Sequence, residues 1–218
     1  MTTAPTAFTD LLATPGVEEI VELRSAFGFM AFHGGSLERM TDVIAADAAA
    51  RAGASLYAVL QPADLRWHIP SHHVDGSEGL AAFLGHVDVA IALHGFGREG
   101  YWHRVLVGGS NRALAEHVAS HLRAGLDHLD IVSDLALIPR TLQGMHKDNP
   151  VNRTAAGGVQ IELPPRARGL TPHRYPIEPL VEALAAAAES WPAYSGSPST
   201  ARSTSPSPSI SKVPPARQ

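Results

Sequence analysis

The chain has 218 residues, of which 44% are hydrophobic, and this length supports one domain with a substantial buried core. Its formal net charge is -4 and both signs are scattered along the sequence, so no basic surface predicts binding to nucleic acid or to an anionic membrane. Because the chain has no cysteine, disulfides, thiolate catalysis and cysteine-ligated metals are excluded. Any metal ligands must therefore be His, Asp or Glu.

Composition also predicts how the chain is divided. We expect an N-terminal extension over residues 1–16, one domain over residues 17–194, and a disordered Ser- and Pro-rich tail over residues 195–218. The N-terminus lacks the basic start and apolar run of a signal peptide, and no stretch is apolar for long enough to span a membrane. We therefore expect a cytoplasmic protein, and we leave its oligomeric state open.

The predicted elements begin with a short helix over residues 8–13 and a strand over residues 17–23. A continuous apolar run then predicts a strand over residues 27–32 that is covered on both faces. An alanine-rich helix over residues 37–52 and a buried strand over residues 55–60 follow. This alternation predicts a right-handed crossover between two parallel strands.

The second half of the sequence continues the alternation. Further strands are predicted over residues 66–69, 87–93, 103–107, 131–138 and 159–163, and further helices over residues 80–84, 112–126 and 177–191. The fold class is therefore α/β. We expect a single open, mixed and mostly parallel sheet that is flanked by helices.

Two strongly buried strands each end in a histidine followed by glycine. The first continues as His33-Gly34-Gly35-Ser36-Leu37-Glu38, and the second ends in His94-Gly95. Gly34 and Gly35 permit a sharp turn, and Ser36 is expected to cap a helix whose first turn contains Glu38. Ligands bind at the carboxyl edge of open α/β sheets. If the two strands are neighbours, both imidazoles lie in the same crevice.

The His33 imidazole with the Glu38 carboxylate is the beginning of a catalytic zinc site, which takes three protein ligands and leaves a position for water. The alternative is that His33 and His94 are unrelated loop histidines. His117 and His121 lie one helical turn apart, but they lack the glutamate of the helical zinc signature. We interpret this second pair as part of a solvated helix face.

Five short motifs, in this order, resemble the poly-gamma-glutamate hydrolase family. They are the segment from His33 to Glu38, His94-Gly95, Val107-Gly108-Gly109, Asn149-Pro150-Val151-Asn152-Arg153, and the strand from Gly158 to Pro164. The resemblance spans residues 21–168. It implies a three-layer sandwich like that of zinc carboxypeptidases, with one Zn²⁺ per chain and hydrolysis of amide bonds between glutamate units.

The resemblance also implies roles for individual residues. It makes His33, Glu38 and His94 the zinc ligands, and it makes Glu162 the general base of a carboxypeptidase-like mechanism. An apolar setting would raise the pKa of Glu162 toward the working range of a general base. The alternative for Glu162 is an exposed glutamate at the end of a strand.

Arg153, next to Asn152, is the candidate for binding a substrate carboxylate or stabilising the oxyanion, because a guanidinium binds carboxylates in bidentate fashion. Arg112, just inside a predicted helix start, is a second candidate for the same role. The alternative is a structural Arg153 that pairs with Asp148 or a loop carbonyl.

The predicted function is therefore zinc-dependent hydrolysis of an amide bond beside a carboxylate, with a gamma-glutamyl or other peptide-like substrate. One alternative is an amidase or deacylase that acts on N-acyl amino acids or small peptides. Another is a non-catalytic family member that binds a carboxylated ligand, which the presence of Glu162 disfavours. The sequence has no lysine-rich groove for a polyanion, and the loop with His68, His72 and His73 matches the family only loosely. Substrate length and stereochemistry are left open.

Overall fold

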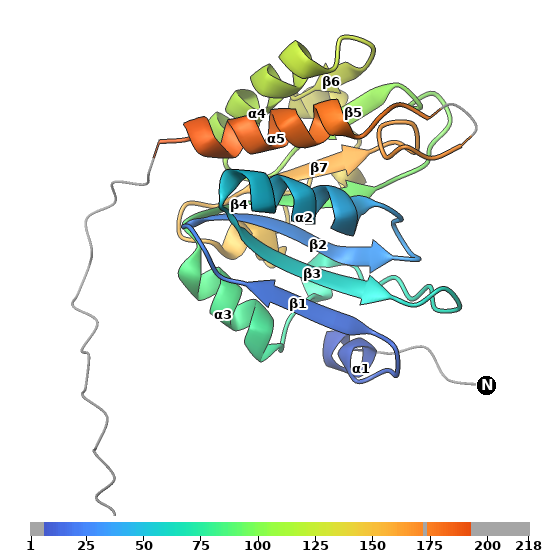
Figure 1. Cartoon of the computed structure of the whole chain (residues 1–218), viewed down its shortest axis with the longest axis vertical. Coiled ribbons are helices and arrows are strands. Elements are labelled where there is room, and N and C mark those ends of the chain that lie inside the picture. Colours follow the sequence, from blue (N-terminus) through green and yellow to red (C-terminus); the bar gives the residue numbers. More distant parts are fainter. Residues whose placement is uncertain (1–6, 172–173, 193–218) are drawn as a thin grey trace, which may run out of the picture.

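The computed structural model describes residues 7–171 and 174–192, so the predicted tail lies outside the described residues (Figure 1). Its strands are β1 (Glu18–Glu22), β2 (Phe27–Gly35), β3 (Ser55–Gln61), β4 (Val89–Gly95), β5 (Arg104–Val107), β6 (Asp130–Val132) and β7 (Val159–Leu163). Its α-helices are α1 (Phe8–Leu12), α2 (Thr41–Ala52), α3 (Glu78–His86), α4 (Arg112–Gly125) and α5 (Glu178–Ser190). The loops also contain short 3-10 helices, η1 (Ser71–His73), η2 (Leu135–Leu137), η3 (Arg140–Leu142) and η4 (Pro150–Arg153).

The strands form a seven-stranded sheet in the order β1-β3-β2-β4-β7-β5-β6. The four central strands β3, β2, β4 and β7 are parallel, whereas β1 is antiparallel to β3 and β5 is antiparallel to β7. This arrangement confirms the predicted open, mixed and mostly parallel sheet. It also makes β2 and β4 neighbours, so their carboxyl ends lie at the same edge.

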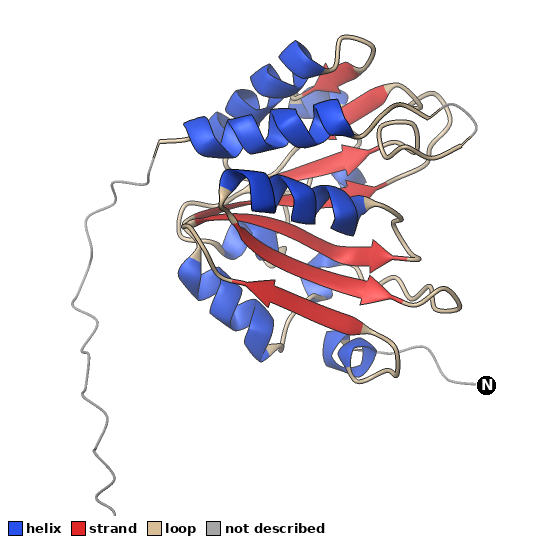
Figure 2. Cartoon of the chain, viewed as in Figure 1, coloured by secondary structure: helices blue, strands red, loops and turns tan. Residues whose placement is uncertain are grey.

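Helices cover both faces of the sheet (Figure 2). Successive side chains of β2 point to opposite faces, as in any strand. Phe29 and Ala31 pack in the cluster that contains the buried residues of α2, α4 and α5, whereas Met30 and Phe32 pack in the cluster that contains those of α1 and α3. The result is a three-layer α/β sandwich. In the described part of the chain, no helix is both long and apolar enough to cross a membrane.

The predicted N-terminal extension contributes to this sandwich. Phe8 and Leu11 of α1 are both 1% exposed, and they pack on the sheet face that α3 also covers. Phe8 and Leu11 are therefore part of the hydrophobic core.

The predicted helix over residues 37–52 begins later than expected, at Thr41. Ser36 does not cap this helix, because its hydroxyl donates to the carbonyl of Leu65 instead. The backbone from Ser36 to Met40 forms turns, and Met40 has a positive φ of 75°. Glu38 therefore lies in a tight loop between β2 and α2, not in a helical turn.

The predicted strand over residues 66–69 is wrong, since this segment has no partner strand in the described structure. The side-chain amide of Gln61 makes the hydrogen bonds to this segment that a neighbouring strand would otherwise make. Its Nε2 donates to the carbonyl of Trp67 at 2.8 Å, and its Oε1 accepts from the Trp67 N–H at 2.7 Å. A side chain at the end of β3 therefore satisfies the backbone of the next loop.

Two glycines with similar backbone angles provide a matched test of the turn after β2. Gly35 has φ 67°, and a Cβ there would overlap the backbone of Gln61; Gly53 has φ 59°, and a Cβ there would meet nothing within 4 Å. We expect Gly53→Ala to lower the free energy of unfolding by about 1 kcal/mol, from backbone strain alone. Gly35→Ala should lower it by about 3 kcal/mol, because steric overlap is added. Chemical denaturation measures both, and equal losses would contradict the close packing of Gly35.

Candidate metal centre and active site

An irregularity in the sheet positions the first histidine. Ala31 of β2 pairs with Ala58 of β3, but Gly34 pairs with Leu60, so β2 carries one extra residue between these pairs. Such a bulge re-aims the side chains next to it. The loop that follows closes tightly, because the Glu38 N–H donates to the His33 carbonyl at 2.9 Å. His33 and the Glu38 carboxylate are thereby brought together.

The Glu38 carboxylate lies between the two predicted histidines. Its Oε1 is 2.8 Å from Nδ1 of His33, and its Oε2 is 3.3 Å from Nδ1 of His94. The N–H of Gly95 also donates to Oε2 at 2.9 Å. One potential ligand atom from each of the three side chains lies within 4.8 Å of the others. The structure therefore brings together the three residues that the sequence predicts as metal ligands.

The hydrogen bonds of these histidines fit a metal ion. Nε2 of His33 lies 2.8 Å from the carbonyl of Ile69, which can only accept, so Nε2 carries the proton. In a neutral imidazole, Nδ1 of His33 then has a lone pair and faces an acceptor-only carboxylate oxygen. That contact requires a shared cation, either a second proton or a metal ion. A backbone carbonyl on the second ring nitrogen is typical of zinc-bound histidines.

His94 gives a further indication of a missing partner. Its side chain is buried, and among the described residues its Nε2 has no hydrogen-bond partner. A buried polar atom without a partner is costly, and such atoms in proteins commonly face a water or an ion. Two imidazoles with one carboxylate also suit Zn²⁺ as a donor set.

Electrostatics keep the carboxylate ionised. Burial alone would raise the pKa of Glu38, but the charges and hydrogen bonds of His33 and His94 outweigh it and lower that pKa well below its usual range. Burial lowers the pKa of His94, but the Glu38 carboxylate, with a smaller effect from Glu162, raises it overall. Glu38 is therefore an anion, ready to balance a cation held between the imidazoles.

Glu162 lies on β7 directly opposite His94 of β4 in the strand register. Its side chain is 5% exposed, which contradicts the alternative of an exposed strand-end glutamate. Burial raises its pKa, and the neighbouring His94 offsets part of that rise. The structure thus places an acid with a raised pKa beside the three potential ligands.

Two amides that sequence reasoning missed hold Glu162 in place. Gln160 Nε2 donates to Oε1 of Glu162 at 2.8 Å, and Asn149 Nδ2 donates to Oε1 of Gln160 at 2.7 Å. Residues two apart on a strand share a face. The spacing of Gln160 and Glu162 on the predicted strand is the signal that could have identified the first of these amides.

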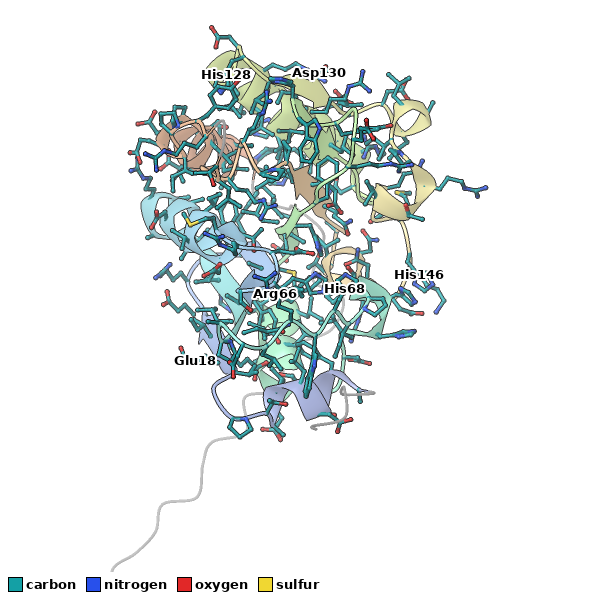
Figure 3. The ribbon with its side chains drawn as sticks, turned by 90° about the vertical axis from the view of Figure 1, so that its right-hand side faces the viewer. Glu18, Arg66, His68, His128, Asp130 and His146 are labelled. Atoms are coloured by element: carbon teal, nitrogen blue, oxygen red, sulfur yellow. The ribbon has the colours of Figure 1, made fainter. Side chains whose placement is uncertain are left out.

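These groups line a cavity of about 680 Å³ at the carboxyl edge of the sheet. This volume is typical of small-molecule sites. The floor contains the metal-ligand candidates and Glu162, and the wall contains His68, His72, Arg140 and His146. Figure 3 looks onto this edge, with His68 over the middle of the sheet and His146 on an outer loop. Sequence analysis did not identify Arg140 or His146 as cavity residues.

The three predicted substrate-binding residues lie elsewhere. Arg112 donates to backbone carbonyls of Val107, Gly109 and Ser133. Arg153 pairs with Asp75 at 3.1 Å, which supports its structural alternative with a partner other than Asp148. Asn152 donates to the carbonyls of Gly144 and His146 at 2.7 and 2.9 Å. None of the three is among the described residues that line the cavity, so their positions do not support direct contact with a substrate.

A buried arginine, Arg168, which sequence analysis did not consider as a site residue, packs next to the centre. Arg168 donates from Nε to the carbonyl of Leu163 at 3.1 Å and from Nη1 to the carbonyl of Arg39 at 2.7 Å. Its guanidinium occupies the space that a side chain at position 95 would need, which explains the glycine there. Arg168 therefore joins the end of β7 to the loop that carries Glu38.

The second histidine pair is remote from this cavity. His117 Nε2 lies 3.0 Å from the carbonyl of Ala187 in α5, and both His117 and His121 contact the hydroxyl of Ser190. The pair is half-buried between α4 and α5, not fully solvated as predicted. It is not among the groups of three or more metal-binding side chains in the described residues.

Comparisons with known proteins agree with this geometry. The structure of a bacteriophage poly-gamma-glutamate hydrolase is 24% identical, with 82% of this chain and 92% of that chain covered and a TM-score of 0.64. The structure of YNDL in a zinc-free apo form is 20% identical, with 85% and 97% covered and a TM-score of 0.72. At these identities the likeness shows a shared fold. No curated protein matches the chain. The family model described as poly-gamma-glutamate hydrolase matches residues 9–187, and the chain therefore belongs to this family.

Proposed function

We propose that the protein is a zinc-dependent hydrolase of an amide bond next to a carboxylate, with a gamma-glutamyl linkage as the first candidate. Membership of the family indicates a hydrolase that acts on amide bonds. The observation that carries the proposal is the cluster of His33, Glu38 and His94, with Glu162 in register beside it, on the floor of one cavity. The similar structure of YNDL is described as an apo form that is zinc-free. This description supports zinc as the metal.

A zinc ion held by His33, Glu38 and His94 would polarise the scissile carbonyl and lower the pKa of water. Glu162 accepts a proton from the attacking water and delivers it to the leaving nitrogen. Its raised pKa suits an acid that must both accept and donate a proton near neutral pH. Gln160 holds one oxygen of the carboxylate, and no hydrogen bond from the described residues occupies the other, Oε2. That second oxygen is free for proton transfer.

The size of the cavity keeps a second substrate class in consideration. A volume of about 680 Å³ accommodates an N-acyl amino acid or a small peptide as well as one stretch of a polymer. The proposed chemistry is the same for both substrate classes. A role limited to ligand binding is disfavoured, because the proposed base is held in a defined orientation by two amides.

Elemental analysis and a substrate panel test the proposal together. We expect about one zinc per chain after purification or reconstitution, as for a catalytic site with three protein ligands. The panel contains poly-gamma-glutamate, a gamma-linked glutamate tripeptide, its alpha-linked isomer and N-acetylglutamate. Hydrolysis that stops on chelation and returns with zinc supports the proposal. A zinc-loaded protein that cleaves none of the four, or cleavage that survives chelation, would refute it.

A further inference from the structure

One cation on the cavity wall has no protein partner. Arg140, at the start of η3, is the one lysine or arginine among the described residues that line the cavity. Its side chain is exposed, and within the described structure it makes no hydrogen bond or ion pair. A guanidinium carries a permanent charge and five donors arranged for planar, bidentate recognition. An anionic group of the substrate is its natural partner.

The carboxylates of the cavity do not neutralise this cation. Glu38 and Glu162 are the two acids that line it within the described residues. Glu38 is engaged by two imidazoles and by a backbone N–H, and Glu162 is held by Gln160. The carboxylates of Glu38 and Glu162 thus lie on the floor of the cavity, and the permanently charged guanidinium of Arg140 lies on its wall. This separation would orient a substrate with its amide over the floor and a carboxylate against the wall.

The loop that carries Arg140 is anchored to the core at two consecutive residues that follow it. The carbonyl of Gln143 accepts from the Gly109 N–H at 2.7 Å. One residue further along, the carbonyl of Gly144 accepts from Asn152 Nδ2 at 2.7 Å. The backbone next to Arg140 is therefore fixed to the core while the guanidinium is free. Asn152 thus helps to hold this part of the cavity wall in place.

The histidines on the same wall are weaker candidates for a carboxylate. The ring of His72 contacts the rings of His73 and His146, with centroids 4.2 and 4.5 Å apart. Desolvation and these two neighbours lower the pKa of His72, while Asp148, which lies 3.8 Å from His146, opposes that effect. A neutral imidazole offers one donor and no charge. Arg140, unlike these histidines, is always positively charged near neutral pH.

We infer that Arg140 binds a carboxylate of the substrate and makes that carboxylate a requirement for tight binding. The inference rests on the proposed function, because it assumes that the same cavity holds the amide substrate. Each unit of a gamma-linked glutamate chain carries a free alpha-carboxylate beside the amide bond. Arg140 would therefore select against neutral peptides of the same size.

Binding without turnover provides the test. The zinc-loaded Glu162→Gln protein is titrated with a gamma-linked glutamate tripeptide and with an analogue whose alpha-carboxylates are converted to amides. We expect Arg140→Gln, in this background, to weaken binding of the carboxylated tripeptide about 10- to 100-fold, as for loss of a charge-assisted bidentate contact. Binding of the amidated analogue should change less than about twofold, and Arg140→Lys should restore part of the affinity.

Two further variants make the result specific. Arg51→Gln, an exposed arginine on α2 that pairs with Glu178, should leave the affinity unchanged. Unchanged affinity in Arg140→Gln, an equal loss for both ligands, or a loss confined to Arg153→Gln would overturn the inference. Absence of hydrolysis by the protein with Glu162 intact would count against the proposed function alone, since the binding measurement needs no turnover.

Discussion

We expect Glu162→Gln to reduce kcat by about 10²- to 10⁴-fold while zinc stays bound, the range that loss of a general base produces. Glutamine has the same shape as glutamate, but it cannot accept the proton that hydrolysis releases. The Gln160 amide can still donate to the carbonyl oxygen of the new side chain. The substitution therefore removes proton transfer and retains the packing around it.

Thermal stability provides a second readout for the same variant. Burial raises the pKa of Glu162, so the ionised form is less favourable in the folded protein than in the unfolded chain at neutral pH. A neutral glutamine avoids that cost. The melting temperature of the metal-free variant should therefore equal or exceed that of the unmodified protein, whereas removal of a purely structural carboxylate would lower it.

Steady-state kinetics, zinc analysis and melting curves are measured on the same preparations. Glu116→Gln is the matched control, because Glu116 is an exposed glutamate on α4 that lies 3.7 Å from Arg123. Its kinetics should not change. If Glu162→Gln keeps its activity within a few fold of the unmodified protein, Glu162 is not the base.

The centre itself could be predicted because its signals are local. His33 and His94 each follow a long apolar run, and each precedes glycine at the end of its strand. What the sequence could not show is that the strands are neighbours, since strand order depends on long-range pairing. The bulge in β2 likewise appears only in the register of its pairing with β3.

Interactions between distant segments account for the errors elsewhere. The backbone at Trp67 resembles a strand in sequence, but the side chain of Gln61 satisfies it instead of a neighbouring strand. Ser36 has the chemistry of a helix cap, but its hydroxyl has a partner in Leu65. In both cases the group that we expect to form a hydrogen bond does form one. Its partner, however, is the side chain of Gln61 instead of a strand backbone for Trp67, and the distant carbonyl of Leu65 instead of a helix N–H for Ser36.

The arginines show the same limit most clearly. Arg112 and Arg153 have the right chemistry for a substrate carboxylate, yet carbonyls and Asp75 already engage them. Arg140 lies in a segment without a recognisable motif, and it remains unpaired in the cavity. A guanidinium is available to a ligand only when the fold leaves it without a partner. Sequence chemistry alone does not contain that information.

Loss of either histidine ligand should remove the stabilisation that zinc provides. At a free zinc concentration about 100 times the dissociation constant, binding to the folded state alone stabilises by about 2.7 kcal/mol. For a domain of this size, that corresponds to a rise in melting temperature of about 5 to 10 °C. We expect this rise in the unmodified protein and its absence in His33→Ala and His94→Ala, with zinc content falling in parallel. His86→Ala is the control, because this exposed histidine of α3 is not among the described residues that line the cavity, and its Nε2 lies 3.0 Å from the Arg24 carbonyl.

The metal-free variants separate ligand loss from structural damage. His33→Ala leaves the buried carbonyl of Ile69 without its donor, so it should lower the melting temperature even in the presence of a chelator. His94→Ala, like His33→Ala, removes a contact with Glu38, but the other nitrogen of His94, Nε2, has no partner in the described structure, so its metal-free form should lose less stability. The zinc-dependent rise, measured as the difference between zinc-saturated and chelated samples, should vanish in both variants despite this inequality. A rise that persists in either variant would exclude that histidine as a ligand, whatever its effect on the metal-free protein.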